Sequence, residues 1–253
     1  MKVSIITVCL NCAETIEDTI KSVLGQGYEN TEYIFIDGGS TDGTLEIITK
    51  YKDRLSRVIS ESDNGIYDAM NKGIKLVTGD IVGFLNSGDF YADNTVITKM
   101  VEFMQTNNLD AAYADLVYVD REDTDKIVRF WKAGKYKKGA FGRAWVPPHP
   151  TFFCCKDIFD RYGYFAEGFQ VAADFELMLR FIEKNQVKID YLPKVIVKMR
   201  TGGKSNTLAG IIRGNREIIK AFQINGLRLP LSYFICKPMT KTSQFFQRAK
   251  KLR

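Results

Sequence analysis

The chain has 253 residues, of which 45% are hydrophobic, so it can bury a large core as one domain or as one domain with an appendage. Its net charge of +6 is unevenly placed: no acidic residue follows Glu217, whereas eight Lys and Arg residues do, which leaves residues 1–217 with a net charge of −2. A near-neutral body argues against a nucleic-acid-binding protein, and the basic tail indicates contact with an anionic surface.

The termini and the cysteines predict a cytoplasmic location. Met1 and Lys2 lead directly into a strand-like run with acidic residues close behind, which is unlike a signal peptide. The longest apolar run near the C-terminus, residues 229–236, contains a proline and is too short to span a bilayer. The five cysteines lack the spacing of a zinc site and are expected to be free thiols, although Cys9 and Cys12 form one isolated C-x-x-C pair.

The first 90 residues alternate between strand-like and helical patterns. Short apolar runs rich in β-branched residues predict buried strands over residues 3–8, 33–36, 57–61 and 81–85. Apolar residues at helical spacing predict the intervening helices over residues 15–24, 44–51 and 66–77. This alternation predicts an α/β fold with a mostly parallel central sheet flanked by helices.

The second part of the chain has a less regular pattern. Residues 132–150 show no periodicity and are predicted to form a loop that lies across a cleft. A predicted strand over residues 187–197 contains Pro193, which indicates an edge position or an interruption at that residue. The other expected elements are helices over residues 94–104, 157–162, 173–185 and 208–225, and strands over residues 111–120 and 126–131.

Two of the predicted strands end in an acidic residue beside glycines. In an open α/β sheet, ligands bind beyond the carboxyl ends of the strands, so Asp37 and Asp89 could hold one ligand between them. Asp37 suits a base or a sugar hydroxyl, and Asp89, which closes the sequence Asn86-Ser87-Gly88-Asp89, suits a divalent cation on a diphosphate. The alternatives are a helix cap for Asp37 and a plain turn for Asp89.

Further polar residues are candidates for the same ligand or for the chemistry. The stretch from Asp63 to Gly73 places polar side chains near a helix N-terminus, which favours phosphate, although a solvated helix face would look the same. Asp174, at the start of an amphipathic helix, is either a cap or a general base. His149, the only histidine, lies in a proline-fixed loop, and a structural role for it stays open.

Another basic segment lies near the end of the predicted domain. Arg200 and Lys204 belong to a glycine-containing stretch that could fold over a diphosphate, or could be a surface loop.

Taken in order along the chain, these segments resemble the family 2 glycosyltransferases, which have the GT-A fold. The resemblance is strongest to bacterial enzymes that build O-antigen, capsule or exopolysaccharide repeat units. Single segments are weak signals, but the ordered set is specific. They are VSIITVCLN (3–11), FIDGGSTDGT (35–44), GIYDAMNKGIKLVTGDIVGFLNSGD (65–89), PHPTFF (148–153), AADFELMLRF (172–181) and MRTGGKSN (199–206). The resemblance implies a GT-A domain over residues 1–206, with a nucleotide-sugar-binding half (1–90) and an acceptor-side half (91–206), followed by a helical basic tail (207–253).

The resemblance also implies a role for each matching position. Asp174 would be the catalytic base, and Asp89 would bind Mn²⁺ or Mg²⁺. The donor would be bound by Thr7, Asp37, Asp63, Gly65, Asn71, Asn86 and Ser87, and the acceptor or diphosphate side would include His149, Arg200 and Lys204. Many relatives carry Asp-Ser-Asp-Asp where this chain has Asn-Ser-Gly-Asp, so a single carboxylate is left for the metal.

The implied activity is an inverting transfer from a nucleotide-diphospho-sugar, a UDP-hexose or UDP-N-acetylhexosamine, to a saccharide acceptor that is lipid-linked. The reduced metal motif keeps an alternative open, namely an inactive nucleotide-sugar-binding subunit of a synthase complex. The aromatic and basic residues of the tail predict peripheral binding to the anionic inner face of the cytoplasmic membrane, unless the tail is a packed helix with a solvated basic end.

Overall fold

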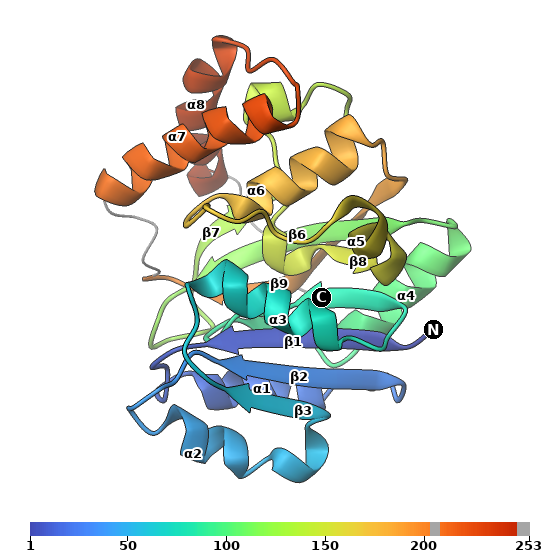
Figure 1. The fold of residues 1–253 in the computed structure, drawn as a ribbon, viewed down its shortest axis with the longest axis vertical. Coiled ribbons are helices and arrows are strands. Elements are labelled where there is room, and N and C mark those ends of the chain that lie inside the picture. Colours follow the sequence, from blue (N-terminus) through green and yellow to red (C-terminus); the bar gives the residue numbers. More distant parts are fainter. Residues whose placement is uncertain (203–207, 247–253) are drawn as a thin grey trace.

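A nine-stranded sheet forms the centre of the molecule in the computed structural model, which describes residues 1–202 and 208–246, with side chains described over 1–202 and 210–240. The strand order is β3-β2-β1-β4-β8-β6-β9-β5, and β7 pairs with β6 (Figure 1). The strands are β1 (Val3–Cys9), β2 (Thr31–Asp37), β3 (Arg57–Ser60), β4 (Ile81–Phe84), β5 (Phe90–Tyr91), β6 (Ala111–Val119), β7 (Ile127–Trp131), β8 (Phe153–Cys155) and β9 (Ile189–Arg200).

The sheet has a parallel half and a mixed half. β1 pairs in parallel with both β2 and β4, and β2 pairs in parallel with β3, as the alternating pattern predicts. Beyond β4, β8 is antiparallel to β4 and β6, whereas β9 is parallel to β6 and antiparallel to β5. The predicted α/β fold is confirmed, but the parallel order ends at β4. The short strands β5 and β8 were not predicted, because two or three residues are too few for a periodic pattern.

The strand with an internal proline is interrupted but is not an edge. β9 lies between β6 and β5. Its register to β6 moves from Leu192 opposite Ala114 to Val195 opposite Asp115, so Pro193 and Lys194 lie in a bulge. A proline has no N–H to donate, and a bulge is one of the places in a sheet that tolerates it.

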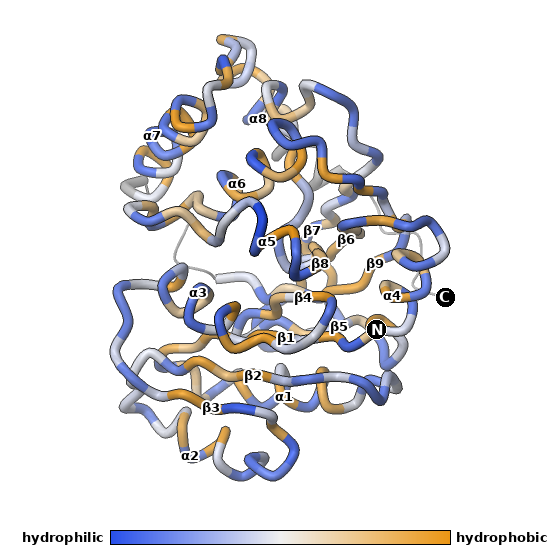
Figure 2. The backbone as a smooth tube through the Cα atoms, turned by 45° about the vertical axis from the view of Figure 1, so that its right-hand side comes forward, coloured by the Kyte–Doolittle hydropathy of each residue, from blue (hydrophilic) through white to orange (hydrophobic). Residues whose placement is uncertain are grey.

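Helices cover both faces of the sheet and enclose two separate cores. One core joins strand residues such as Ile5 and Phe35 to α1 (Ile16–Leu24), α2 (Thr44–Thr49) and α4 (Val96–Thr106). The other joins Ile6 and Phe84 to α3 (Ile66–Leu76), α5 (Lys156–Tyr162) and α6 (Ala173–Met178). Figure 2 shows the strands as mostly hydrophobic, as expected for strands buried on both faces. Short helical segments complete the chain: η1 (Lys52–Arg54), η2 (Phe141–Arg143), η3 (His149–Thr151) and the π-helical η4 (Leu179–Lys184), which extends α6.

The stretch predicted as a loop, residues 132–150, packs closely against the rest of the molecule. It contains η2 and the start of η3, and Phe141 in η2 is fully buried. The Trp145 indole N–H donates to the Ala133 carbonyl (2.7 Å), and the Trp145 ring packs edge-on against Phe141. Aromatic packing therefore orders this stretch, in which the only described helical pieces are η2 and the start of η3.

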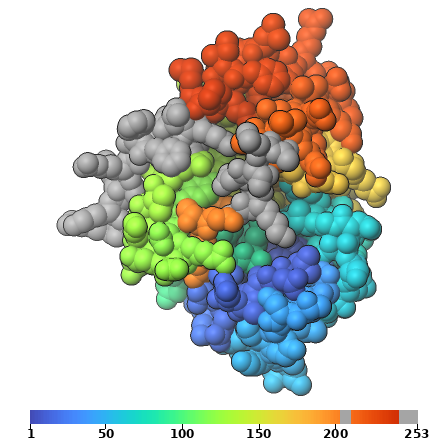
Figure 3. Space-filling view, turned by 90° about the vertical axis from the view of Figure 1, so that its left-hand side faces the viewer, coloured from blue at the N-terminus to red at the C-terminus, as the bar shows by residue number. Residues whose placement is uncertain are grey.

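Two helices close the end of the molecule opposite β3, α7 (Leu208–Ile224) and α8 (Ser232–Phe246), as Figures 1 and 3 show. α7 buries Ile218, Ala221 and Phe222, and α8 buries Tyr233 near Phe175 of α6. These contacts make α7 part of the folded body, whereas the predicted boundary at residues 206/207 stays a prediction. Among the described residues, no helix has the length and apolar character needed to cross a membrane.

Candidate active site

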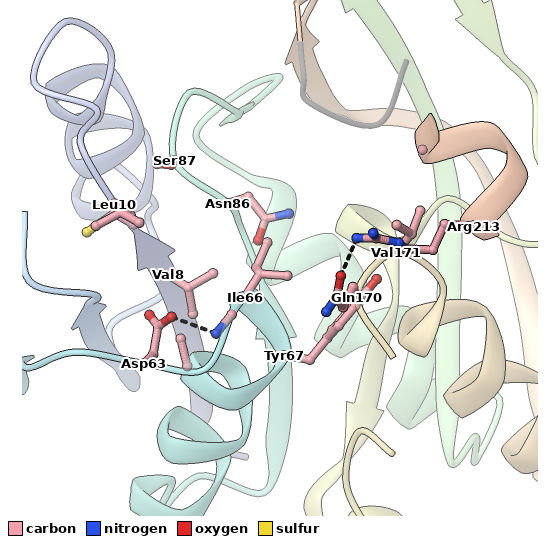
Figure 4. Close-up of a pocket in the computed structure, with 14 residues that line it drawn as sticks. Val8, Leu10, Asp63, Ile66, Tyr67, Asn86, Ser87, Gln170, Val171 and Arg213 are labelled. Carbon is pink, nitrogen blue, oxygen red and sulfur yellow. Dashed lines mark hydrogen bonds between the residues drawn. The ribbon is translucent and has the colours of Figure 1, made fainter. Parts of the chain in front are cut away.

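A pocket of about 750 Å³ opens at the carboxyl ends of β1 and β4. β2 and β3 lie on one side of β1, and β4 lies on the other, so the chain connections diverge at this point. Such divergence leaves a crevice in open α/β sheets, and ligands bind there. Figure 4 shows that the pocket wall combines residues from the strand ends, from α3, from the segment before α6 and from α7.

Three residues at the end of β1 line one side of the pocket: Val8, Cys9 and Leu10. Thr7 does not line it, because its hydroxyl is buried, donates to the Leu85 carbonyl (2.7 Å) and lies 3.0 Å from the Tyr33 hydroxyl. Thr7 lies two residues before the end of β1, where its hydroxyl bonds to Tyr33 of β2 and to Leu85 directly after β4, and only the last residues of β1 and Leu10 reach the pocket. The structure thus places the neighbours of Thr7, rather than Thr7 itself, at the pocket.

Asp37, predicted to contact the ligand, is completely buried beside the pocket. Its carboxylate accepts hydrogen bonds from the Ser40 amide (3.0 Å), the Ser60 hydroxyl (2.7 Å) and the Ser40 hydroxyl. Burial alone would raise the pKa of Asp37, but these hydrogen bonds outweigh burial and lower it. Asp37 therefore holds the turn after β2 to the end of β3, and both of its oxygens are already engaged.

Asp63 and Gly65, two of the predicted donor-binding residues, both line the pocket. Asp63 accepts a hydrogen bond from the Gly65 amide (2.8 Å), and Gly65 begins α3 with a φ of 110°, a conformation that favours glycine. The second Asp63 oxygen lies 2.5 Å from the position that a Cβ on Gly38 would take. A glycine at position 38 is therefore required for this carboxylate to lie where it does.

The turn after β4 brings two of its predicted residues into the pocket. Asn86 and Ser87 line the wall, and the Asn86 Oδ1 atom is buried with no hydrogen-bond partner among the described residues. Asp89 is only 5% exposed, and burial raises its pKa to about 8 against the opposing effect of Arg200. Arg200 donates to the Gly88 carbonyl (2.9 Å) and pairs with Asp18, so it joins this turn to α1.

The turn offers a modest set of metal ligands. Among the residues whose side chains are described, no group of three or more His, Cys, Asp or Glu residues could hold a metal ion. A hard divalent cation on a diphosphate needs only one or two protein oxygens, since phosphate and water supply the others. The Asn86 oxygen fits that requirement at the pocket wall, whereas the Asp89 carboxylate is buried in the same turn and does not line the pocket.

Asp174 lies beside the pocket and is paired with a tyrosine. The Tyr67 hydroxyl donates to Asp174 Oδ1 (3.1 Å), and Tyr67 lines the pocket from α3 (Figure 4). Burial, together with the charge of Asp174, raises the pKa of Tyr67 well above its usual value, so the hydroxyl keeps the proton that it donates. Tyr67 was not among the predicted site residues, although it lies between two of them in sequence.

His149 lies near Asp174 in an apolar setting. Its ring packs against Phe84 (centroids 5.5 Å apart) and Phe165 (5.9 Å). Within the described part of the chain, neither buried ring nitrogen has a hydrogen-bond partner. Burial lowers the pKa of His149 despite the opposing charge of Asp174, so the imidazole is neutral at neutral pH.

Asn71, another predicted donor-binding residue, is not part of the pocket wall. The Asn71 side chain donates to the Phe165 carbonyl (3.0 Å) and accepts from the Phe165 amide (2.9 Å), which ties α3 to the segment before α6. Lys204 lies outside the described residues.

The wall opposite Asp63 comes from residues that the sequence did not single out. Gln170, Val171, Gly210 and Arg213 line it, and the Arg213 guanidinium donates to the Gln170 side-chain oxygen (Figure 4). Gln170 and Val171 belong to an irregular segment, and Gly210 and Arg213 to α7. A helical pattern identifies α7 but gives no sign that this end of the helix reaches a pocket.

The comparisons with known proteins agree with this geometry. The family described as Glycosyl transferase family 2 matches residues 4–159. WfaP of Escherichia coli, a UDP-Glc:alpha-D-GlcNAc-diphosphoundecaprenol beta-1,3-glucosyltransferase, is 37% identical over 123 residues, so the match spans about half of each protein, 47% of this chain and 47% of WfaP.

Two solved structures have the same fold. The crystal structure of S. aureus TarS 1–349 in complex with UDP-GlcNAc has a TM-score of 0.70 at 18% identity, covering 93% of this chain and 69% of that one. The mannosyltransferase PcManGT from Pyrobaculum calidifontis, in complex with GDP-Man and Mn²⁺, has a TM-score of 0.67 at 18% identity, covering 96% of this chain and 69% of that one.

Proposed function

This chain belongs to glycosyl transferase family 2 and has the GT-A fold, and on that premise we propose that it transfers a sugar from a nucleotide-diphospho-sugar to a saccharide, with inversion at the anomeric carbon. The proposed donor is a UDP-hexose or UDP-N-acetylhexosamine, and the proposed acceptor is lipid-linked, in the synthesis of a bacterial surface polysaccharide such as O-antigen or capsule. Support comes from similar proteins: the name of WfaP gives UDP-Glc and a diphosphoundecaprenol-linked acceptor, and TarS binds UDP-GlcNAc.

The observation that carries this proposal is the position of Asp174 beside the pocket that holds Asp63 and Asn86. A base for glycosyl transfer must reach the acceptor hydroxyl while the donor is bound next to it. The Tyr67 hydroxyl joins the two parts, because it lines the pocket and hydrogen bonds to Asp174 Oδ1 (3.1 Å). Among the described residues no hydrogen bond reaches Asp174 Oδ2, so we assign the acceptance of the proton to this oxygen.

In the proposed reaction, Asp174 removes the proton from the acceptor hydroxyl as that oxygen attacks the anomeric carbon. The new glycosidic bond forms on one face of the sugar while the bond to the diphosphate oxygen breaks on the other, and the nucleoside diphosphate leaves. Tyr67 fixes the orientation of the Asp174 carboxylate. General bases of this kind typically contribute about 10²- to 10⁴-fold to the rate.

For the donor, we assign the nucleoside to the side of the pocket formed by Val8, Leu10 and Asp63, and the diphosphate to Asn86 and Ser87. Thr7, Asp37 and Asn71 support this site from outside the pocket. Asn86 and Asp89 would hold a divalent cation, Mn²⁺ or Mg²⁺, which when bound neutralises charge on the diphosphate. His149 and Arg200 border the site without an assigned contact to a ligand.

We further propose that α8 rests on the anionic inner face of the cytoplasmic membrane, near a lipid-linked acceptor. Its outward face is apolar, with Ile235 and Met239 exposed by 68% and 65%, and Leu231 directly before the helix is exposed by 87%, while Tyr233 points inward. No acidic residue follows Glu217 to repel anionic lipid. Each Lys or Arg near such a surface contributes about 1 kcal/mol.

The membrane proposal is tested by sedimentation with vesicles. A double variant, Ile235→Ser with Met239→Ser, should bind vesicles of phosphatidylglycerol and phosphatidylcholine more weakly than the wild type. Val58→Ser, on β3 and 37% exposed, is a matched control that should bind normally. Equal binding of the double variant and the control would contradict the proposal.

The activity is tested with a panel of sugar nucleotides. We expect one UDP-sugar to release UDP in the presence of a lipid-linked saccharide and Mn²⁺ or Mg²⁺, and release to fall when EDTA removes the metal. The rival function, a nucleotide-sugar-binding subunit without turnover, predicts that UDP-sugars stabilise the protein against heat but that no UDP is released with any acceptor.

A further inference from the structure

Glu217 of α7 is a buried carboxylate with an unusual set of partners. It is only 8% exposed, and it accepts hydrogen bonds from three consecutive backbone amides: those of Gln170 (2.9 Å), Val171 (2.9 Å) and Ala172 (2.8 Å). Hydrogen bonds to a charged acceptor are stronger than neutral ones, and three of them on one carboxylate fix a backbone segment firmly.

The fixed segment joins the pocket to the proposed base. Gln170 and Val171 line the pocket, and Ala172 directly precedes α6, in which Asp174 is the second residue. Segments without regular secondary structure depend on such side-chain bonds for their position, because their backbone amides have no ladder partners.

A second contact, from Asn225 directly after α7, holds the later part of α6. The Asn225 side-chain amide donates to Glu176 Oε1 (2.9 Å), and Glu176 also forms a salt bridge with Arg180 (2.9 Å). α7 and the residue that follows it therefore hold the chain in place both before and after Asp174. Arg213, on the same helix, meets Gln170 across the pocket wall.

We propose that Glu217 is a positioning residue for the transfer reaction: by holding residues 170–172, it sets where Asp174 and the acceptor-side wall lie relative to the donor. This inference rests on the proposed function. It assigns Glu217 no contact with either substrate. Its effect is expected on the chemical step and not on nucleotide binding, because Val8, Leu10 and Asp63 lie on the opposite side of the pocket.

The test compares Glu217→Gln with a matched variant of another buried glutamate. The amide of glutamine puts an N–H group against backbone N–H donors, so at least one of the three bonds is lost. The control is Glu32→Gln, because Glu32 is 5% exposed and likewise accepts from a backbone amide, that of Thr78 (2.9 Å), but lies away from the pocket. Glu217→Asp, which keeps both oxygens, should be intermediate.

For Glu217→Gln we expect kcat to fall about 10- to 100-fold, since a displacement of about 1 Å can cost that much, with UDP affinity unchanged. Hydrogen exchange without substrate should speed up at the amides of residues 170–172 by about tenfold or more. Glu32→Gln should keep wild-type kcat. The proposal is overturned if both variants lose kcat equally, or if exchange at residues 170–172 is unchanged. Should the wild type transfer no sugar, the proposed function fails, while the exchange result still decides whether Glu217 holds this segment.

Discussion

The two walls of the pocket are built in different ways. On the donor side, parallel strands fix the backbone. Asp37, the last residue of β2, is buried in bonds to neighbouring turns, and Asp89, in the turn between β4 and β5, is buried beside Arg200. On the opposite side, a buried carboxylate of α7 fixes an irregular segment, and the residues that this segment carries face the pocket. A carboxylate near a strand end can therefore support the structure without reaching the pocket, and its position in the sequence does not reveal which of the two it does.

The largest effect should come from Asp174→Asn. The asparagine amide cannot take the proton from the acceptor hydroxyl, so we expect the rate of sugar transfer to fall by about 10³-fold, within the range for loss of a general base. UDP affinity should stay near the wild-type value. UDP release and calorimetry measure the two quantities. The control is Asp160→Asn on α5, whose partners are Lys156 and Tyr164 and which should leave turnover unchanged. Normal transfer by Asp174→Asn would remove the base from the proposed reaction.

A smaller effect is expected for Asp63→Ala, which separates ligand contact from structural support. Asp63 lines the pocket, so its loss should weaken UDP binding by about 10- to 100-fold, equivalent to one or two hydrogen bonds to a charged group. The melting temperature should change little. If UDP binds normally to this variant, the nucleoside is not held at this end of the pocket.

Asp37→Asn should show the opposite behaviour, a loss of stability of about 1–3 kcal/mol, because a buried network loses an acceptor. The pKa of Asp37 is lowered in the folded protein, so its stabilising effect is present above the unfolded pKa of about 3.9 and is lost as the pH falls through the folded value. The difference between variant and wild type in denaturant unfolding should therefore be full at pH 7 and shrink below about pH 4. If the Asp37→Asn variant is as stable as the wild type but binds UDP weakly, the result would support the ligand contact that the sequence predicts for Asp37.

The smallest effect is expected for the apolar face of α8. With a soluble saccharide acceptor, the Ile235→Ser and Met239→Ser double variant should turn over within about twofold of the wild type, since exposed substitutions away from a site are usually near neutral. With a vesicle-borne acceptor its rate should fall. A loss with the soluble acceptor would mean that α8 supports the pocket wall through α7, to which the Lys237–Asn215 hydrogen bond joins it.

Much of the fold could be predicted because its first four strands follow simple periodic rules. The runs at residues 3–8 and 81–85 and the helix at 66–77 all appear within a few residues of their predicted bounds. The mixed half of the sheet is harder to predict from the sequence, because β5 and β8 are very short and residues 132–150 are ordered by aromatic packing.

The site was predicted in part for a related reason. Asp63, Gly65, Asn86 and Ser87 lie in segments whose place at a strand end or helix start is visible in the sequence. The place of Thr7 outside the pocket depends on its contacts with Tyr33 and Leu85, and the burial of Asp37 depends on Ser60. All of these partners are distant in sequence. Gln170 and Arg213 meet only because α7 folds back onto α6, and no local pattern encodes that contact.

The close approach of Gly38 to Asp63 has a consequence for how this protein tolerates change. Residue 38 touches no proposed ligand group, yet a single methyl group there would occupy the space of the Asp63 carboxylate oxygen. The Asp63 carboxylate would then have to move away from the pocket, and nucleotide affinity would fall. Because residue 38 itself contacts no ligand, a search for contact residues would overlook it. Two turns far apart in sequence thus share one small volume, and neither can vary without the other.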